Sequence, residues 1–254
     1  MSSLKRSIGR VLAIWWREMG AYFFSPMAYL VLVLFVLENG AIFWFLTRHF
    51  SGHPRQVQLV MSYLFGFAYY WIIPLSPLLT MRLFAEERRA GTLEVLMTAP
   101  VTEAQVVLGK FFAAETFYCL IWLSLTPLLG ILAALAIGEP DWGPAAAIYF
   151  GLFSLGLLTN ALGVFSSSLA RNQLAAAVMA LSGNLFFSHV LPLGVHLFPG
   201  NPDARRFFDY ISFTEHFDND YRAGIVDVRY LVFYATIAAF FLFLSVRAVE
   251  AKKP

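Results

Sequence analysis

The sequence predicts an all-α polytopic membrane protein with six transmembrane helices, and three observations lead to this fold class. Hydrophobic residues make up 59% of the 254 residues and charged residues only 13%, and the mean hydropathy is +0.67. A soluble domain of this length cannot bury so much apolar surface. The apolar residues form uninterrupted runs of about 20, the length that crosses a hydrocarbon core roughly 30 Å thick. Residues 1–254 are therefore treated as a single transmembrane domain.

The first expected element is an amphipathic helix over residues 4–20, ahead of every long apolar run. Its apolar residues recur at helical spacing on one face, and basic residues occupy the other face. A helix of this kind lies in the plane of the membrane interface. Pro26 is expected to separate it from the first span. The apolar face consists of Leu4, Ile8, Val11, Leu12, Trp15 and Met19.

The apolar runs then predict the six spans and the connections between them. Residues 139–144 contain several turn-forming residues, and residues 170–173 leave almost no loop. The two long connections cover residues 82–104 and 199–228. The spans are expected at residues 27–47, 58–81, 111–137, 144–169, 173–198 and 229–249.

The distribution of Lys and Arg sets the expected orientation, because cytoplasmic loops carry an excess of these residues. With the N-terminus inside, twelve of the 18 lie on the cytoplasmic side and six on the other side. We therefore expect a multi-pass protein of the cell inner membrane with both termini in the cytoplasm. The cytoplasmic set is Lys5, Arg6, Arg10, Arg17, Arg82, Arg88, Arg89, Lys110, Arg171, Arg247, Lys252 and Lys253, and the external set is Arg48, Arg55, Arg205, Arg206, Arg222 and Arg229.

The external connection, residues 199–228, mixes aromatic and acidic residues without a regular period. Side chains with an apolar body and a polar tip favour the membrane interface. An interfacial or re-entrant helix is expected here, since a folded external domain would need many more residues. The aromatic and apolar members are Phe207, Phe208, Tyr210, Ile211, Phe213, Phe217 and Tyr221, and the acidic members are Asp209, Glu215, Asp218 and Asp220.

Residues 82–97 form a dense charged island between two long apolar runs. Two interpretations stay open from the residues alone: a solvated loop whose charges fix the topology, or two short helices that dock a soluble partner. The acidic and basic residues before Gly91 are good helix formers, and Gly91-Thr92 offers a break with an N-cap. An apolar stripe over residues 93–97 suits a second helix, and Thr102 is expected to begin the next one.

The charged island also resembles a known family. Residues 84–96 read Phe-Ala-Glu-Glu-Arg-Arg-Ala-Gly-Thr-Leu-Glu-Val-Leu, and Ala-Pro-Val and Gly-Lys follow at residues 99–101 and 109–110. This pattern is similar to permease subunits of type-2 ABC transporters. Residues 211–217, Ile-Ser-Phe-Thr-Glu-His-Phe, and 222–227, Arg-Ala-Gly-Ile-Val-Asp, resemble one branch, that of gliding-motility permeases and of the permease for nitrous-oxide-reductase maturation. The resemblance covers nearly the whole chain in order.

The resemblance implies a function and a set of contact residues. In that family the segment between spans two and three is the coupling helix, which sits in a groove of a separate ATPase. Residues 82–104 would thus be a cytoplasmic coupling segment, and ATP and Mg would bind the partner ATPase while the permease exports a substrate. The pathway would run between two copies along spans one, two and five. The implied contact or hinge residues are Phe84, Glu86, Glu87, Arg88, Arg89, Gly91, Thr92 and Glu94.

The expected partners follow from the same argument. No Gly-x-x-x-x-Gly-Lys-Ser/Thr sequence occurs in the chain, so ATP hydrolysis must belong to another polypeptide, and no cofactor is expected on this one. An ABC motor has two nucleotide sites and this chain has one coupling segment. Two ATPase copies with a homodimer of this chain are therefore the simplest assembly, and a paralogue pair is the alternative. Membrane lipid surrounds the spans, and the net charge of +2 gives no reason to expect nucleic acid.

Two other functions were weighed. The first is ATP-driven mechanical or assembly work, in motility or metalloenzyme maturation, without solute transport and with a periplasmic accessory protein. The second is an intramembrane enzyme, which is disfavoured because no catalytic Ser/His/Asp arrangement is recognisable. The single cysteine, Cys119, excludes an intrachain disulfide. Hydrogen-bonded or interfacial histidines are expected rather than a metal site, and the five are His49, His53, His189, His196 and His216.

Polar residues inside the spans are further candidates, because a charge at mid-membrane costs about 2.5–3.5 kcal/mol. For the asparagines, hydrogen bonds between helices are favoured over substrate contact. Glu38 stays open between a structural pair and a translocation role. Glu115, early in the third span, is expected to reach water or Lys110. The mid-span candidates are Glu38, Asn39, Asn160 and Asn184.

Overall fold

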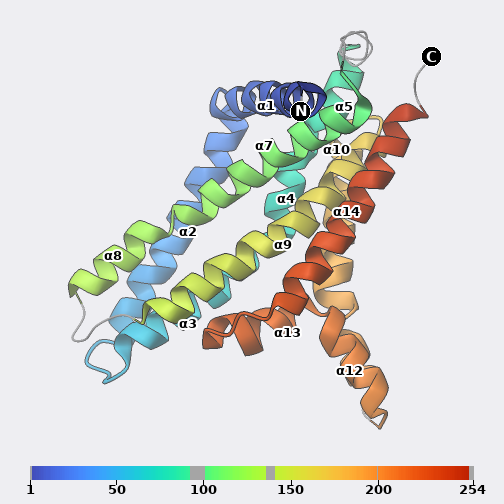
Figure 1. Cartoon of the computed structure of the whole chain (residues 1–254). Coiled ribbons are helices and arrows are strands. Elements are labelled where there is room, and N and C mark those ends of the chain that lie inside the picture. The colour runs from blue at the N-terminus through green and yellow to red at the C-terminus, as the bar shows by residue number, and fades with distance from the viewer. Residues whose placement is uncertain (1, 92–100, 136–140, 199, 252–254) are drawn as a thin grey trace.

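Helix α9 (Trp142–Leu169) forms the centre of the molecule, and most of the other spans pack against it (Figure 1). The computed structural model describes residues 2–91, 101–135, 141–198 and 200–251, and every regular element within these ranges is a helix. The most apolar stretch of α9 is 72% buried, against 22–33% for the other long spans. Its neighbours are α4 (Ile72–Thr80), α7 (Glu103–Leu123), α10 (Gln173–Leu185) and α14 (Val228–Glu250).

Glycines and small polar residues let these helices approach α9 closely. A Cβ atom at Gly163 would collide with Thr80 of α4, and one at Gly156 would collide with Tyr118 of α7. Ser76 of α4 donates a 2.6 Å hydrogen bond to the carbonyl of Thr159 on α9. Small residues at helix contacts are typical of membrane bundles, where apolar side chains gain little by leaving lipid. The residues of α9 therefore select its neighbours.

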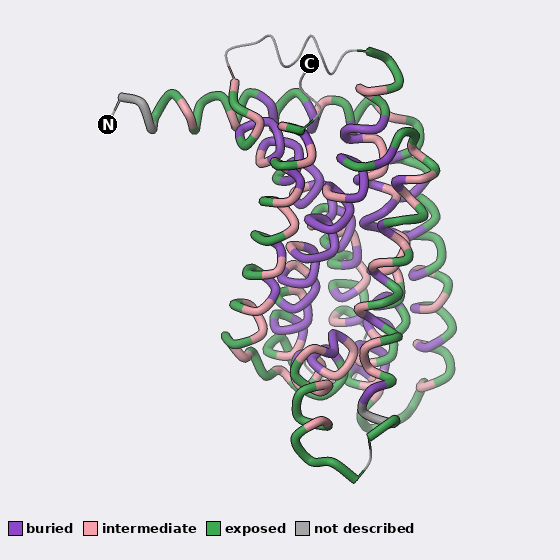
Figure 2. Tube along the Cα trace, turned by 90° about the vertical axis from the view of Figure 1, so that its right-hand side faces the viewer, coloured by how far each residue is buried: buried purple, intermediate pink, exposed green. Residues whose placement is uncertain are grey.

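The remaining surface of the bundle is suited to lipid. Five described helices are long and apolar enough to cross a membrane, and a bent pair supplies a sixth span. Helices α2 (Pro26–His49), α10 and α14 expose large apolar side chains along their length. Figure 2 shows exposed residues along the outside of the bundle. Backbone polar groups in lipid must be satisfied internally, and helices achieve this. The predicted all-α polytopic membrane fold is confirmed.

The second span differs from the continuous helix expected at residues 58–81. It is split into α3 (Gln56–Tyr69) and a segment that begins at Ile72, with a bend of 46° between them. The bend precedes Pro74, which has no N–H for the carbonyl of Tyr70 and whose ring crowds that carbonyl. The break therefore has a local cause that hydropathy does not register.

Two further spans also differ in their ends. The third begins at Glu103 rather than residue 111, because Thr102 and Gln105 form a reciprocal capping box. The expected start of a helix at Thr102 is thus confirmed. After a break at Ser124 the chain continues as α8 (Thr126–Leu135). The fifth span continues beyond α10 through a π-helical turn, η1 (Phe186–Val190), and α11 (Leu193–Leu197).

Helix α1 (Ser2–Phe23) lies across one end of the bundle (Figures 1 and 2). One face packs on α7, where Gly109 leaves room for Ile14 and Trp15 donates a 3.1 Å hydrogen bond to Thr116. A second face is apolar and exposed, with Ile8, Leu12 and Trp16 at 51%, 55% and 73% exposure. An exposed apolar face beside a bundle fits a helix at the membrane interface. Contact with lipid stays a prediction.

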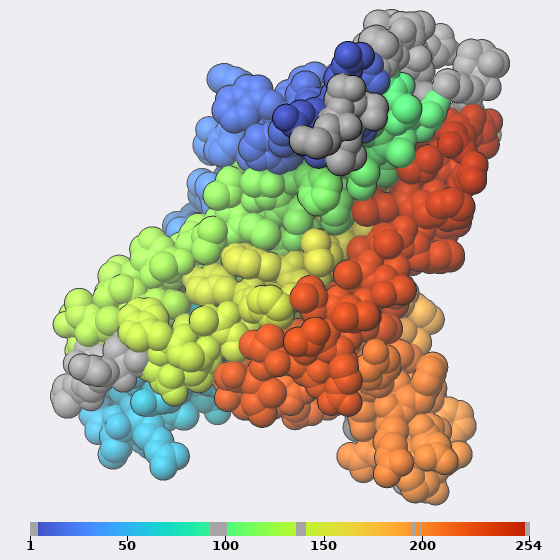
Figure 3. All heavy atoms as spheres, viewed as in Figure 1, coloured from blue at the N-terminus to red at the C-terminus, as the bar shows by residue number. Residues whose placement is uncertain are grey.

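The ends of the helices define two poles of the molecule. Both chain termini lie at the same end as α1 and α5 (Arg82–Arg89), which we call the terminal end (Figure 1). The opposite end, called the distal end, carries α12 (Pro202–Ile211), which stands apart from the body of the molecule (Figure 3). Helix α5, which begins the charged island, and α12 of the expected external connection therefore lie at opposite ends.

Beyond α12 the chain turns back into the bundle. The turn-back consists of α13 (Phe213–Glu215), the π-helical turn η2 (His216–Asp220) and the 3₁₀ turn η3 (Tyr221–Ala223). Phe213, Phe217 and Tyr221 have no exposed surface. Tyr221 lies against Gly151 of α9, where a Cβ atom would collide with its ring. The segment is thus part of the core at the distal end.

His216 is the titratable group buried by this turn-back. Its side chain is 1% exposed, its ring stacks on Tyr230 with centroids 3.7 Å apart, and its Nδ1 lies 2.6 Å from the hydroxyl of Tyr234. Burial lowers the pKa of His216 from its ordinary 6.5 to about 4. The imidazole is therefore neutral at neutral pH.

Acid should destabilise the distal end through this histidine. The unfolded chain takes up the proton below about pH 6.5 and the folded chain only below about pH 4, so the unfolded state binds more protons between these values. The free energy of unfolding should fall as the pH is lowered through this window, by at most about 3 kcal/mol. The change His216→Gln should flatten the pH dependence of the thermal unfolding midpoint, whereas the exposed control His49→Gln should keep the wild-type slope. Equal slopes in both variants would contradict this linkage.

Candidate functional site

The charged island begins as α5, which continues the second span after a break at Met81. The backbone N–H groups of Phe84 and Ala85 donate to the hydroxyl of Ser167 at 3.0 and 3.3 Å, and that hydroxyl donates to the Met81 carbonyl at 3.1 Å. One side chain of α9 thus holds the start of α5. Phe84 has no exposed surface and packs inside the bundle.

Arg88 attaches the other end of α5 to the C-terminus of α9. Its guanidinium donates to the carbonyl oxygens of Ser168, Leu169 and Ala170 at 2.6, 3.2 and 2.5 Å. The last carbonyls of a helix have no partner within it and carry the negative end of its dipole. The Arg88 guanidinium gives three of these carbonyls a hydrogen-bond donor and places a positive charge at the negative end of the dipole. Helix α5 is therefore fixed to the central helix along its whole length.

A buried ammonium joins α5 to α1 and α7. The side chain of Lys110 on α7 is 1% exposed, and its Nζ lies 3.0 Å from Glu18 Oε1 of α1 and 2.9 Å from Glu87 Oε1 of α5. Arg17 of α1 contacts the same two oxygens at 2.6 and 3.0 Å. We call these four residues the charge cluster. Its two cations and two carboxylates compensate one another, as burial requires.

The surroundings favour the ionised forms in the charge cluster. Burial by itself would raise the pKa of Glu18, but Lys110 and Arg17 outweigh it, and the pKa is lowered. For Arg17, burial acts to lower the pKa, while Glu18 and Glu87 act in the other direction and raise it. Glu18 and Arg17 are therefore charged at neutral pH.

The remaining face of α5 is open. Glu86 and Arg89 are exposed, and so is Gly91, whose φ of +69° suits a residue without a Cβ atom. A groove of about 500 Å³ runs beside Glu86 between α1, α5 and α7. Thr92 and Glu94, with the second predicted short helix, lie outside the described residues. The island is thus divided into residues that bind within the chain and residues that face outward.

The mid-span asparagines of α9 and α10 make contacts between helices. Asn160 donates a 2.9 Å hydrogen bond to Glu115 of α7, and Asn184 donates a 3.2 Å bond to the Ile73 carbonyl of α4. Both are buried. The expectation that Glu115 reaches water or Lys110 is wrong, because Glu115 is buried against Asn160 and Lys110 pairs with Glu18 and Glu87. These contacts support the structural interpretation of the asparagines.

The two polar residues of the first span differ in their surroundings. Asn39 is buried and donates a 2.8 Å hydrogen bond to the Phe35 carbonyl of its own helix. Glu38 is exposed and accepts a 3.1 Å hydrogen bond from the Trp71 indole. Of the four mid-span candidates, Glu38 is the one whose side chain faces outward from the subunit.

The described part of the chain offers no metal centre. No group of three or more His, Cys, Asp or Glu side chains in it is arranged to hold an ion. Instead, His189 pairs with Ser188 at 2.8 Å, and His53 accepts from the Arg55 N–H at 3.1 Å. These contacts agree with the expectation of hydrogen-bonded histidines.

Sequence reasoning missed three residues on which this site depends: Glu18, Lys110 and Ser167. One of them left a signal. Lys110 stands directly before the apolar run of the third expected span, and a lysine is almost never buried without a partner. The partner itself lies on other helices, so its identity follows only from the fold. Glu18 belongs to the polar face of α1 and Ser167 to the end of α9. Residues of these types are ordinary there, so neither stands out in the sequence.

Comparison with known families identifies the chain's relatives. A family model described as ABC-2 family transporter protein matches residues 24–200, a stretch that includes α5 and most of the bundle. The chain belongs to the ABC-2 transporter family. It is thus the membrane component of an ABC transporter, and such a permease works with an ABC ATPase subunit. A search among curated proteins finds no match to this chain.

Replacement of Lys110 tests the charge cluster of this ABC-2 permease. Lys110→Met should destabilise the protein by about 3–5 kcal/mol, because it leaves two carboxylates without their buried cation. The thermal unfolding midpoint of the purified chain in detergent reports this loss. The matched control is Lys5→Met, which removes an exposed lysine of α1 and should have little effect.

A rescue variant separates charge from packing. Adding Glu87→Gln to Lys110→Met should recover much of the lost stability, since Arg17 and Glu18 then still pair and no unpaired charge remains. If Lys110→Met alone unfolds at the wild-type temperature, the charge cluster does not hold the three helices together.

Proposed function

We propose that this chain is the permease subunit of an ABC exporter and transmits ATP hydrolysis on a separate ATPase to the transport of a substrate across the inner membrane. ATP and Mg would bind the ATPase. The terminal end would face the cytoplasm, as the excess of Lys and Arg there supports. The observation that carries the proposal is the outward face of α5, Glu86 and Arg89, on a helix fixed to three others.

The outward face of α5 has the properties of a docking surface. Glu86 offers carboxylate acceptors and Arg89 offers guanidinium donors. Both side chains are exposed, and they closely follow the buried residues 83–85. Charge-assisted hydrogen bonds are stronger and shorter than neutral ones. A solvated loop that only sets topology needs neither an attachment to α9 nor a buried lysine. The contacts of Ser167, Arg88 and Lys110 therefore favour the docking interpretation.

The same contacts describe how a movement of α5 would reach the spans. Movement of an ATPase bound to Glu86 and Arg89 would displace α5 as a unit, because both of its ends are held by α9. The charge cluster ties the displacement to α1 and α7 at the same time. Close-packed interiors transmit such shifts rather than absorb them. In this proposal α5 is the coupling helix, and Glu87 and Arg88 act inside the permease.

Glu38 supports an assembly of two copies. It lies halfway along α2 and is exposed in the single chain, among exposed apolar neighbours such as Leu34 and Leu37. A carboxylate in contact with lipid at that depth is costly. A second copy that covers α2, or a water-filled path between the copies, removes this cost. We therefore propose a homodimer whose contact or pathway includes the outward face of α2.

The docking proposal is tested by Glu86→Ala with Arg89→Ala in the complex purified with its ATPase. Both side chains are exposed and not part of the charge cluster, so folding should be unaffected. Loss of a desolvated charge contact costs about 2–5 kcal/mol. We expect the permease to change the rate of ATP hydrolysis much less in this variant than in the wild type. The measurement is ATPase activity with and without the permease, at equal amounts of membrane-inserted chain.

The matched control is Arg247→Ala with Glu250→Ala, an exposed ion pair of α14 at the same end of the molecule. This variant should retain normal coupling. If the α5 variant also retains normal complex formation and normal coupled activity, α5 is only a solvated segment.

The dimer is tested by composition and by cross-linking. Native mass spectrometry should find two copies of this chain with two ATPase subunits. In a Cys119→Ala background, Leu37→Cys should give a dimer with a flexible bifunctional thiol reagent. Phe240→Cys, a comparably exposed position on α14, serves as the lipid-facing control and should not. A stable and active complex with a single copy of this chain would exclude the homodimer.

A further inference from the structure

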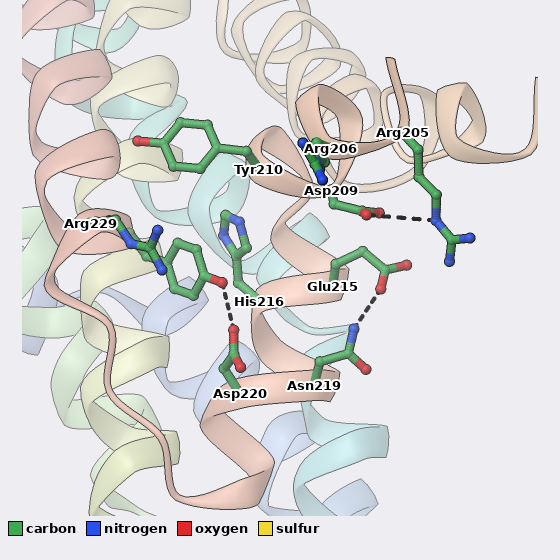
Figure 4. A pocket seen from close by; sticks show the side chains of 10 residues that line it. Arg205, Arg206, Asp209, Tyr210, Glu215, His216, Asn219, Asp220 and Arg229 are labelled. Atoms are coloured by element: carbon green, nitrogen blue, oxygen red, sulfur yellow. Dashed lines mark hydrogen bonds and ion pairs between the residues drawn. The ribbon is translucent and has the colours of Figure 1, made fainter. Parts of the chain in front are cut away.

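The distal end carries a polar cavity of about 330 Å³ that the coupling proposal does not use. It lies between α12, the turn-back at α13 and η2, and the first turn of α14 (Figure 4). The lining combines cations, carboxylates and two tyrosines. Its residues are Arg205, Arg206, Asp209, Tyr210, Glu215, His216, Asn219, Asp220, Arg229 and Tyr230.

Two guanidinium groups at the α12 side of the cavity have donors to spare. The side chains of Arg205 and Arg206 are 65% and 83% exposed. Their carboxylate neighbours, Asp209 and Asp203 on the same helix, lie 3.8 Å away, which is beyond hydrogen-bond distance. Such pairs on an exposed helix are weak. Arg205 and Arg206 can therefore bind an external anion.

Two carboxylates, from α13 and η2, form the wall on the side of the turn-back. Glu215 accepts a 2.7 Å hydrogen bond from the Asn219 amide, and Asp220 accepts a 2.6 Å bond from the Tyr230 hydroxyl. Within the described ranges neither carboxylate forms an ion pair. Neutral donors orient them without neutralising their charge. This wall is therefore ready for a cationic group with N–H donors.

Three other groups of the lining are already occupied. Asp227 holds Arg229 with hydrogen bonds of 2.6 and 2.8 Å, which removes this guanidinium from competition. The rings of His216 and Tyr230 stack on each other, so their facing π-surfaces are closed. The cavity thus lacks the open aromatic cage that favours quaternary ammonium groups. A primary ammonium, which donates hydrogen bonds to carboxylates, fits better.

The elements next to this cavity carry exposed apolar side chains. Phe207 on α12 is 59% exposed, Leu193 and Leu197 on the adjoining α11 are 54% and 71% exposed, and Val228 at the start of α14 is 66% exposed. Exposed apolar side chains around a charged recess at the end of a membrane bundle suit the headgroup region of a bilayer. A ligand with a charged head and hydrocarbon tails satisfies both surfaces.

We propose that the distal cavity binds a headgroup that carries a phosphodiester and a primary ammonium, as in phosphatidylethanolamine. The phosphodiester lies at Arg205 and Arg206, and the ammonium lies at Glu215 and Asp220. The same chemistry is present in free glycerophosphoethanolamine. The site is at the opposite end from α5 and needs no ATPase, so it stands independently of the coupling proposal.

The test measures lipid binding to the purified full-length chain in detergent by native mass spectrometry. Phosphatidylethanolamine, phosphatidylcholine and phosphatidylglycerol with identical acyl chains are titrated separately. Phosphatidylethanolamine should bind about tenfold more tightly than either of the others, as expected for one additional charge-assisted contact. Free glycerophosphoethanolamine is added as competitor. Displacement at equal concentration identifies a free headgroup as the source, and lack of displacement identifies the membrane lipid.

Two paired variants assign the two walls. Glu215→Gln with Asp220→Asn keeps the shape and should abolish the preference for phosphatidylethanolamine over phosphatidylglycerol. Arg205→Gln with Arg206→Gln should weaken both lipids about tenfold. The control, Arg48→Gln with Arg55→Gln, removes two exposed distal-end arginines outside the cavity and should bind as wild type. Equal binding of the three lipids by the wild type, or unchanged binding in both cavity variants, would overturn the proposal.

Discussion

A lysine ammonium withdrawn from water needs anionic partners, and the way Lys110 obtains them organises the terminal end of the molecule. Its two carboxylates come from α1 and from α5, elements that are distant in sequence. Apolar contact alone would hold these helices weakly, because lipid is as apolar as the side chains they would bury. The charge cluster, with Arg88 and Ser167, therefore fixes how these helices pack, which apolar contact does not. The position of α5 follows from charge and hydrogen bonding.

Hydropathy and run length were sufficient to predict the spans, because crossing a membrane is a constraint on consecutive residues. The bend before Pro74 was missed, although the proline is visible, since a proline can also be accommodated in a membrane helix. The start at Thr102 was predicted because a cap is local. The insertion of Phe213, Phe217 and Tyr221 into the bundle was not predicted. Their spacing is that of an interfacial segment, and a contact such as that of Tyr221 with Gly151 joins residues far apart in the sequence.

The candidate site could be located from the sequence but not resolved into roles. Charge density marked residues 82–97, and the resemblance named them together. The structure separates Glu86 and Arg89, which face outward, from Glu87 and Arg88, which bind Lys110 and the end of α9. Adjacent residues of like charge carry no signal of which one points inward. Which side chain points inward depends on how the short helix is rotated toward its partners, which are more than 20 residues away in the sequence.

The contacts on α9 have a consequence for the register of the chain. At one end Ser167 holds α5, and toward the other end Gly151 receives Tyr221 of the turn-back. These two points are about four and a half helical turns apart on one straight element. Inserting or deleting one residue between them would rotate one attachment by about 100° relative to the other. Homologous chains should therefore change the length of this stretch only in steps that restore the rotational phase.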